Sequence, residues 1–306
     1  MALEYSFLEN GWVVRIHNRI QDMSLEDKLE ALELLRKNVV VVWKNQKLTP
    51  REELDFCGSF GSYDFADVAE YWDNLPSDQQ DIFIKEYPGI LRVTAKPGTN
   101  GGPGHFSHKT ELKWHSDRIG HPDRRPCVWL YGITDTTGSV TNFTNNFLAY
   151  NALSEEEKNF YGGLRVSHYN TRYQQDSDRS THAWRIEENL IIKNMGIWDN
   201  IIVENDFGDK SFFFSPLQVG CIEGMSEEKS LEIADELLQY LTQPQFVYSH
   251  QWEDGDVVIS EQTFSMHSRD AFNDMEKRYL HHIQFNVEKI LPDLKYPGYN
   301  DRGHLV

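Results

Sequence analysis

The sequence predicts a single α+β domain in which helices surround a β core. Three observations favour this fold class. First, the pattern of the first 60 residues predicts a helix, a buried strand and a second helix. Second, strand-like stretches recur between the later predicted helices. Third, no repeat, low-complexity tract or clear linker divides the 306 residues. Such a length suits one large domain or two ordinary ones. Because no boundary is visible, we expect one domain over residues 1–306.

Capping residues and periodicity predict the N-terminal elements. Ser24 is an N-cap candidate ahead of leucines at helical spacing in residues 25–35, which predicts a helix. Residues 39–43 are rich in valine and too few for a helix, so they predict a strand buried on both faces. Thr49, followed by Pro50 and an acidic residue at N3, predicts a second capped helix.

The middle of the chain predicts loops and further strands. Residues 61–104 contain acidic clusters, prolines and glycines around a short strand expected at residues 90–94. Long loops of this kind are often lids, so we expect an active-site lid around residues 62–110. Capped helices are expected after Ser154 and Ser226. Strand-like stretches lie at residues 128–132, 190–193, 211–214, 246–249, 257–260 and 279–287.

Composition and charge exclude several classes of protein. Hydrophobic residues at 39% and charged residues at 25% describe a folded globular chain. A formal net charge of −18 would repel nucleic acid and anionic lipid, so neither is an expected partner. Three cysteines without CxxC spacing, no signal-like start and no apolar run of membrane-spanning length favour a cytoplasmic location. The sequence leaves the oligomeric state open, including a homo-oligomer.

The segment Trp-His-Ser-Asp at residues 114–117 is the first candidate for a metal site. If residues 115–117 are extended, His115 and Asp117 share one face and can bind one cation. The pattern alone is weak, because residues 121–123 repeat the same spacing. His267, just after a predicted strand, is the best third ligand. Two histidines and one carboxylate suit Fe(II) with open positions; zinc is the competing metal, although no HExxH pair is present.

Arg278 is the candidate for binding an anion. It starts an alternating stretch in which Arg278, Leu280, His282 and Gln284 share one face. A buried arginine needs an anionic partner, which is ordinarily one of the chain's own 48 acidic residues. The alternative is a bidentate contact with the distal carboxylate of a dicarboxylate cosubstrate that chelates the same metal.

The ordered set of motifs resembles one enzyme family. The segment at residues 114–117, the Gly-Ser-Val-Thr segment at residues 138–141, His267 and Arg278 eleven residues later follow the order of the Fe(II)/2-oxoglutarate-dependent dioxygenases of the taurine dioxygenase (TauD/TfdA) family. Residues 34–50 are also similar to that family's opening helix, strand and turn. The resemblance covers most of the chain and thins at about residues 163–209, where we expect a variable insert.

The resemblance implies a double-stranded β-helix (jelly-roll) core flanked by helices. It also implies that the catalytic residues His115, Asp117 and His267 bind iron, and that Arg278 and Thr141 bind 2-oxoglutarate. The implied reaction is hydroxylation of a small-molecule substrate with O₂, with release of succinate and CO₂. The protein contributes geometry and exclusion of water.

Two departures from the family pattern bear on the substrate. Residues 260–263 read Ser-Glu-Gln-Thr where the family often has Trp-Asp-Asn-Arg, and His282 stands where sulfonate-oxidising members carry a second arginine. We therefore do not expect taurine as the substrate. Two alternatives remain at this level, a zinc-dependent hydrolase and a non-catalytic binding protein on the same scaffold.

Overall fold

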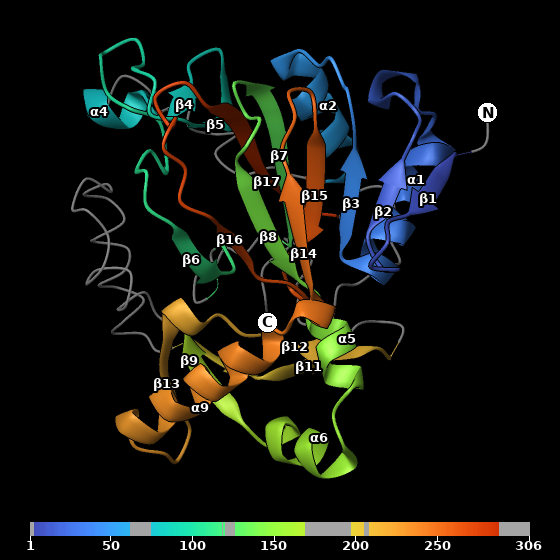
Figure 1. Ribbon diagram of the computed structural model, residues 1–306, viewed down its shortest axis with the longest axis vertical. Helices are drawn as coiled ribbons and strands as arrows, with labels where there is room; N and C mark the ends of the chain where they lie inside the picture. The colour runs from blue at the N-terminus through green and yellow to red at the C-terminus, as the bar shows by residue number, and fades with distance from the viewer. Residues whose placement is uncertain are drawn as a thin grey trace.

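The computed structural model describes residues 3–61, 75–117, 119, 126–168, 197–204 and 208–287. The strand expected at residues 190–193, the second His-Pro-Asp copy at residues 121–123, and parts of the expected lid and insert lie outside the described residues. Two β-sheets form the core of the upper part of the molecule, and helices and small sheets form a lower layer (Figure 1). Among the described residues, no helix is long and apolar enough to cross a membrane.

The larger sheet has eight strands in the order β1-β2-β3-β15-β7-β17-β5-β4. Its central strands β3 and β15 are buried throughout, as their runs of β-branched residues predict. All neighbours are antiparallel except β2 and β3. The strand bounds are β1 Tyr5–Phe7, β2 Val14–Ile16, β3 Val40–Trp43, β4 Phe83–Ile84, β5 Tyr87–Val93, β7 Cys127–Thr134, β15 Val257–Glu261 and β17 Tyr279–Phe285.

Two helices, α1 (Leu25–Asn38) and α2 (Pro50–Phe60), cover the outer face of this sheet. The predicted N-cap Ser24 and the predicted capping box at Thr49 are present, and at both positions the acidic residue at N3 closes a capping box. The helices bury leucines and phenylalanines against alternate strand residues, including Trp43 and Trp129. Each large apolar side chain buried there contributes about 1.5–3 kcal/mol relative to an exposed one. Val39, expected in the strand, instead has φ 69° and ends α1.

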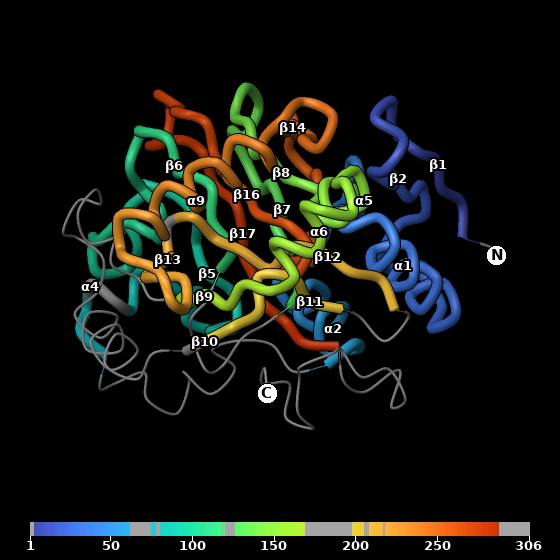
Figure 2. Tube along the Cα trace, turned by 90° about the horizontal axis from the view of Figure 1, so that it is seen from below, coloured from blue at the N-terminus to red at the C-terminus, as the bar shows by residue number. Residues whose placement is uncertain are grey.

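The smaller sheet lies on the other side of the large one (Figure 2) and has the order β14-β8-β16-β6. Phe143 from this sheet packs in one cluster with Val128, Leu130 and Val258 from the inner face of the large sheet. Two facing sheets with helices on the outside match the expected α+β jelly-roll architecture. The strand bounds are β6 Leu112–His115, β8 Val140–Thr144, β14 Val247–Gln251 and β16 His267–Arg269.

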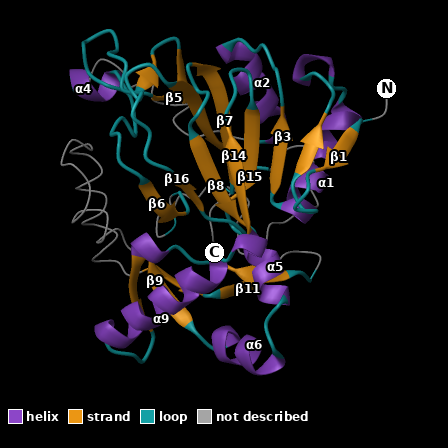
Figure 3. Cartoon of the chain, viewed as in Figure 1, coloured by secondary structure: helices purple, strands orange, loops and turns teal. Residues whose placement is uncertain are grey.

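Within the described residues, the lower layer contains small sheets and helices (Figure 3). The predicted caps Ser154 and Ser226 begin α6 and α9, and α9 buries its apolar stripe against β13 and the neighbouring core. The bounds of the helices and strands are α5 Asn146–Asn151, α6 Glu155–Gly162, α9 Glu227–Leu241, β9 Arg165–His168, β10 Ile197–Asn200, β11 Ile202–Glu204, β12 Lys210–Phe212 and β13 Val219–Ile222. Short 3-10 helices connect elements at Ile20–Asp22, Pro216–Gln218 and Pro244–Phe246.

The described part of the expected lid contains regular structure as well as loop. Helix α4 (Ser77–Gln80) precedes β4, and the strand expected at residues 90–94 is the second half of β5. Asp81 organises the adjacent turn, because its carboxylate accepts hydrogen bonds from the backbone of Asn100 and Gly102. A role of this region as a lid stays a prediction.

Candidate active site

Two histidines meet where β6 ends and β16 begins. His115 is the last residue of β6, His267 is the first residue of β16, and the two are paired across the antiparallel ladder. Their ring centroids are 4.2 Å apart, and both residues are buried. The Nδ1 of His115 lies 2.6 Å from the backbone oxygen of Lys113. Because a carbonyl oxygen only accepts, Nδ1 donates this hydrogen bond, and Nε2 is the ring nitrogen that faces the site.

Asp117 joins these histidines from a turn and not from a strand. The sequence suggested an extended segment over residues 115–117, but β6 stops at His115 and Asp117 lies in the following turn. Ser116 fixes that turn by donating its hydroxyl to the backbone oxygen of Ser265 at 2.8 Å. Asp117 Oδ1 consequently lies 3.3 Å from His115 Nε2 and 3.9 Å from His267 Nε2. One ligand atom from each of the three residues lies within 4.8 Å of the others, a spacing that can hold a metal ion.

The protonation states of this cluster suit a divalent cation. Burial alone would raise the pKa of Asp117, but the neighbouring His267, His115 and His282 outweigh it and hold that pKa well below its usual value. Burial, together with nearby His115, lowers the pKa of His267 to about 3. At neutral pH the aspartate is therefore ionised and His267 is neutral, which are the forms that bind metals.

Three other side chains form hydrogen bonds with Asp117. Its Oδ2 accepts hydrogen bonds from His282 Nε2 at 3.0 Å and from Gln284 Nε2 at 2.8 Å, and its backbone N–H donates to Gln262 Oε1 at 2.7 Å. The alternation of residues in β17 predicted that His282 and Gln284 share one face. It did not predict that they contact Asp117. Gln262 was noticed in the sequence only as a departure from the family pattern.

Arg278, the residue before β17, is buried without an acidic partner among the described residues. It is 2% exposed, and its Nε donates to the hydroxyl of Ser139 at 3.1 Å. Its Nη1 is buried and has no hydrogen-bond partner within the described part of the chain. Burial, reinforced by Arg269, lowers the pKa of Arg278 to about 9, so the side chain remains charged at neutral pH. An unpaired buried guanidinium is costly, and an anionic ligand would relieve that cost.

Thr141 lies on β8, two residues beyond the Ser139 that contacts Arg278. It is buried, and its hydroxyl oxygen accepts a hydrogen bond from Trp252 Nε1 at 2.9 Å. Trp252 therefore has a structural role beside Thr141. His250 is likewise structural, since its two ring nitrogens contact Tyr248 and Asp256.

Other described histidines contact residues outside the three-residue cluster. His108 Nδ1 contacts Thr110, and Arg269 donates to the backbone oxygens of His108 and Thr110. His168 in β9 is buried and lies 2.9 Å from Asp199 of β10. Cys127, the first residue of β7, is fully buried.

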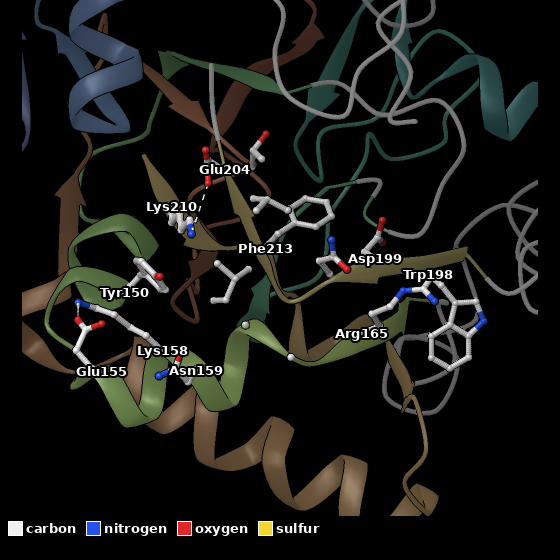
Figure 4. Close-up of a pocket in the computed structure, with 16 residues that line it drawn as sticks. Tyr150, Glu155, Lys158, Asn159, Arg165, Trp198, Asp199, Glu204, Lys210 and Phe213 are labelled. Carbon is white, nitrogen blue, oxygen red and sulfur yellow. Dashed lines mark hydrogen bonds and ion pairs between the residues drawn. The ribbon is translucent and has the colours of Figure 1, made fainter. Parts of the chain in front are cut away.

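A cavity of ≈ 960 Å³ opens in the lower layer, between α6 and the small sheets (Figure 4). Its cationic side chains are paired with acids: Lys158 with Glu155 at 2.9 Å, Lys210 with Glu204 at 3.6 Å. Thr263, the neighbour of Gln262, belongs to its lining, but none of the three candidate ligands does. This cavity is therefore distinct from the cluster around Asp117.

Two histidines and one carboxylate, gathered on a jelly-roll core with positions left open, define the class of non-heme iron oxygenases. Residues 16–284 match the family described as "Taurine catabolism dioxygenase TauD, TfdA family". The chain belongs to this family. The family predicted from the sequence, and with it the predicted class of oxidoreductase, is confirmed.

Individual relatives agree with this assignment. The pentalenolactone F synthase of Streptomyces arenae is 26% identical over 181 residues, which cover 56% of this chain and 60% of that protein. The alpha-ketoglutarate-dependent 2,4-dichlorophenoxyacetate dioxygenase of Cupriavidus pinatubonensis is 24% identical over 273 residues, which cover 85% of this chain and 91% of that protein. The crystal structure of AAD-2 in complex with Mn(II) and N-oxalylglycine has a TM-score of 0.72 at 19% identity, covering 94% of this chain and 99% of that one. This structural likeness confirms the predicted fold.

Proposed function

We propose that this protein is an Fe(II)- and 2-oxoglutarate-dependent oxygenase in which His115, Asp117 and His267 bind the iron. The observation that carries the proposal is the convergence of these three residues, 152 positions apart at the extremes, with ligand atoms within 4.8 Å of one another. Two imidazoles with one ionised carboxylate form a donor set that suits Fe(II). Three protein ligands leave three positions of an octahedral ion open.

The proposed site for 2-oxoglutarate is Arg278 together with Thr141. The buried Nη1 of Arg278, which has no hydrogen-bond partner among the described residues, supports this assignment because it needs an anion. A guanidinium presents parallel N–H groups that match a carboxylate, which fits the distal carboxylate of the cosubstrate. Ser139 orients the guanidinium through Nε, and Trp252 orients the Thr141 hydroxyl.

The chain's own contribution to the reaction is binding and shielding. When bound, iron and 2-oxoglutarate supply the oxidising chemistry, with O₂ as oxidant and succinate and CO₂ as products. His115, Asp117 and His267 would hold the metal, and burial of the two histidines limits the access of bulk water to it. Arg278 and Thr141 would bind and orient the cosubstrate.

The substrate that we propose is a small molecule other than taurine, oxidised at a C–H bond. His282 occupies the position of the second arginine of sulfonate-oxidising relatives, and its Nε2 is engaged by Asp117. That leaves a weaker binding site for an anionic group. The relatives' names include both a pentalenolactone synthase and a phenoxyacetate dioxygenase, so the family tolerates varied substrates. The strongly acidic composition and sparse cysteines support a cytoplasmic location without nucleic-acid partners.

The test is succinate formation from 2-oxoglutarate under air with Fe(II). Asp117→Ala and His267→Ala are each expected to abolish it, whereas His17→Ala, at an exposed histidine, is the matched control and should retain it. Binding of Fe(II) and 2-oxoglutarate without oxygen should produce a visible charge-transfer band in the wild type and in the control. Unchanged turnover in either ligand variant would refute the assignment. Activity that needs zinc but neither oxygen nor cosubstrate would instead support a hydrolase.

A further inference from the structure

The carboxylate of Asp117 is contacted differently on its two oxygens. Oδ1 faces the two histidines, with Nε2 atoms at 3.3 Å and 3.9 Å. Oδ2 accepts two hydrogen bonds, from His282 Nε2 at 3.0 Å and from Gln284 Nε2 at 2.8 Å. Because an ionised carboxylate only accepts, His282 carries its proton on Nε2 and Gln284 directs its amide NH₂ to the same oxygen.

We infer that His282 and Gln284 are positioning residues that make Asp117 bind the metal through Oδ1 alone. The inference rests on the proposed function. A carboxylate with both oxygens available can chelate a cation through both of them. Here two donors already occupy Oδ2, so chelation through both oxygens would disturb two buried hydrogen bonds. Loss of a buried partner is unfavourable, because the remaining polar group is left without a hydrogen bond.

Binding through Oδ1 alone determines how many coordination positions of the metal remain open. Two histidines and a one-oxygen aspartate use three of the six positions of an octahedral ion and leave three open. An aspartate that chelates through both oxygens would leave only two. A cosubstrate that chelates the metal needs two positions, and oxygen needs a third.

The contacts of His282 show that Asp117 is the group that orients its ring. His282 is 3% exposed, and its Nδ1 has no hydrogen-bond partner within the described residues. Gln284 is 6% exposed and lies two residues further along β17, on the same face. Both donors therefore reach Asp117 from one strand, and burial strengthens their hydrogen bonds.

The experiment measures metal binding rather than turnover. Mn(II) is titrated into metal-free protein and followed by electron paramagnetic resonance, and Co(II) is added to report coordination through its visible absorption. His282→Leu and Gln284→Met each remove one donor. We expect each to weaken Mn(II) binding about 10–100-fold, as is typical when an outer partner of a ligand is lost, and to change the Co(II) spectrum. His282→Gln, which restores an N–H donor, should recover most of the affinity.

The matched control is His281→Leu, the same substitution on the adjacent residue. His281 reaches the opposite face of β17, where its Nδ1 lies 2.7 Å from Glu53 Oε1. This variant should lose stability but keep wild-type Mn(II) affinity and Co(II) spectrum. If His282→Leu does not fold, Gln284→Met and His282→Gln decide the question.

The outcomes separate the inference from the proposed function. Wild-type protein that binds neither Mn(II) nor Co(II) refutes both. Wild-type binding with unchanged affinity and spectrum in the His282→Leu and Gln284→Met variants refutes the inference alone. Equal losses of affinity in His281→Leu and His282→Leu would also refute it, because the effect would then be a general loss of folding.

Discussion

His281 and His282 are consecutive residues of β17 that contact carboxylates on opposite sides of the strand. His281 Nδ1 lies 2.7 Å from Glu53 Oε1 on α2, and His282 Nε2 lies 3.0 Å from Asp117 Oδ2 between the sheets. Successive side chains in a strand point to opposite faces, so the two imidazoles cannot share a partner. The same strand therefore joins the helical layer to the candidate metal site.

Glu53 is predicted to be important for stability. It is 0% exposed, and its two oxygens accept hydrogen bonds from His281 and from Trp129 Nε1 at 3.0 Å. Glu53→Ala leaves both donors buried without a partner and opens a cavity, so it should lower the free energy of unfolding by about 3–5 kcal/mol. Urea denaturation measures this change. Asp55→Ala on the same helix removes only an exposed pair with Arg51 and should cost less than about 1 kcal/mol.

Arg278 is predicted to determine affinity for 2-oxoglutarate. Loss of the guanidinium in Arg278→Leu should weaken cosubstrate binding by about 2–5 kcal/mol, at least about 30-fold. Arg278→Lys keeps the charge but loses the paired N–H geometry. Its affinity for 2-oxoglutarate should therefore lie between those of the wild type and Arg278→Leu. Calorimetric titration of 2-oxoglutarate into the Mn(II)-loaded protein measures both. If Arg278→Leu binds 2-oxoglutarate with wild-type affinity, Arg278 does not anchor the cosubstrate. The affinity of Arg278→Leu for Mn(II) should equal that of the wild type.

Trp252 is predicted to support the cosubstrate site through Thr141. Trp252→Phe removes the 2.9 Å hydrogen bond to the Thr141 hydroxyl, which is then free to rotate. We expect 2-oxoglutarate to bind about 5–10-fold more weakly, the equivalent of about 1 kcal/mol. Trp43→Phe is the matched control, because Trp43 is equally buried and its Nε1 has no hydrogen-bond partner among the described residues. It should lower stability without changing cosubstrate affinity.

Glu261 is predicted to make stability depend on pH. Burial raises its pKa from 4.5 to about 7, although its Oε1 accepts a hydrogen bond from the backbone of Thr263. The folded protein therefore retains this proton at pH values where the unfolded chain has lost it, so stability falls as pH rises from about 4.5 to about 7. Above pH 7, ionisation of Glu261 lowers the free energy of unfolding by about 3 kcal/mol relative to its value below pH 4.5.

Glu261→Gln removes this titration while preserving an acceptor for Thr263. The variant should gain stability relative to wild type as pH increases from 5 to 8, by up to about 3 kcal/mol. Urea denaturation of both proteins at the two pH values provides the comparison. A difference in unfolding free energy that does not change with pH would contradict the raised pKa.

Local sequence signals determined most of the regular structure. The N-cap at Ser24 and the capping boxes at Thr49 and Ser154 were predicted and are present, because capping involves residues only three positions apart. The buried run before residue 43 was likewise predicted as a strand. Its start was one residue too early, because Val39 takes a positive φ that closes the preceding helix.

The candidate site residues could be named from the sequence, but their partners could not. Strand periodicity placed His282 and Gln284 on one face, whereas their contact with Asp117 depends on residues 165 and 167 positions away. The ordinary expectation for Arg278 was an acidic partner. The structure instead places Ser139 beside it, with no acid among the described residues paired to it.

The sequence by itself determined which residue types are available, which stretches become helix or strand, and which family the chain resembles. These depend on neighbours within a few positions or on the linear order of motifs. Tertiary structure alone decided that Asp117 enters the site from a turn, that Oδ2 is held from β17, and that Arg278 remains unpaired at Nη1 among the described residues. The physical reason is that burial and hydrogen-bond partners are set by packing between strands distant in the chain.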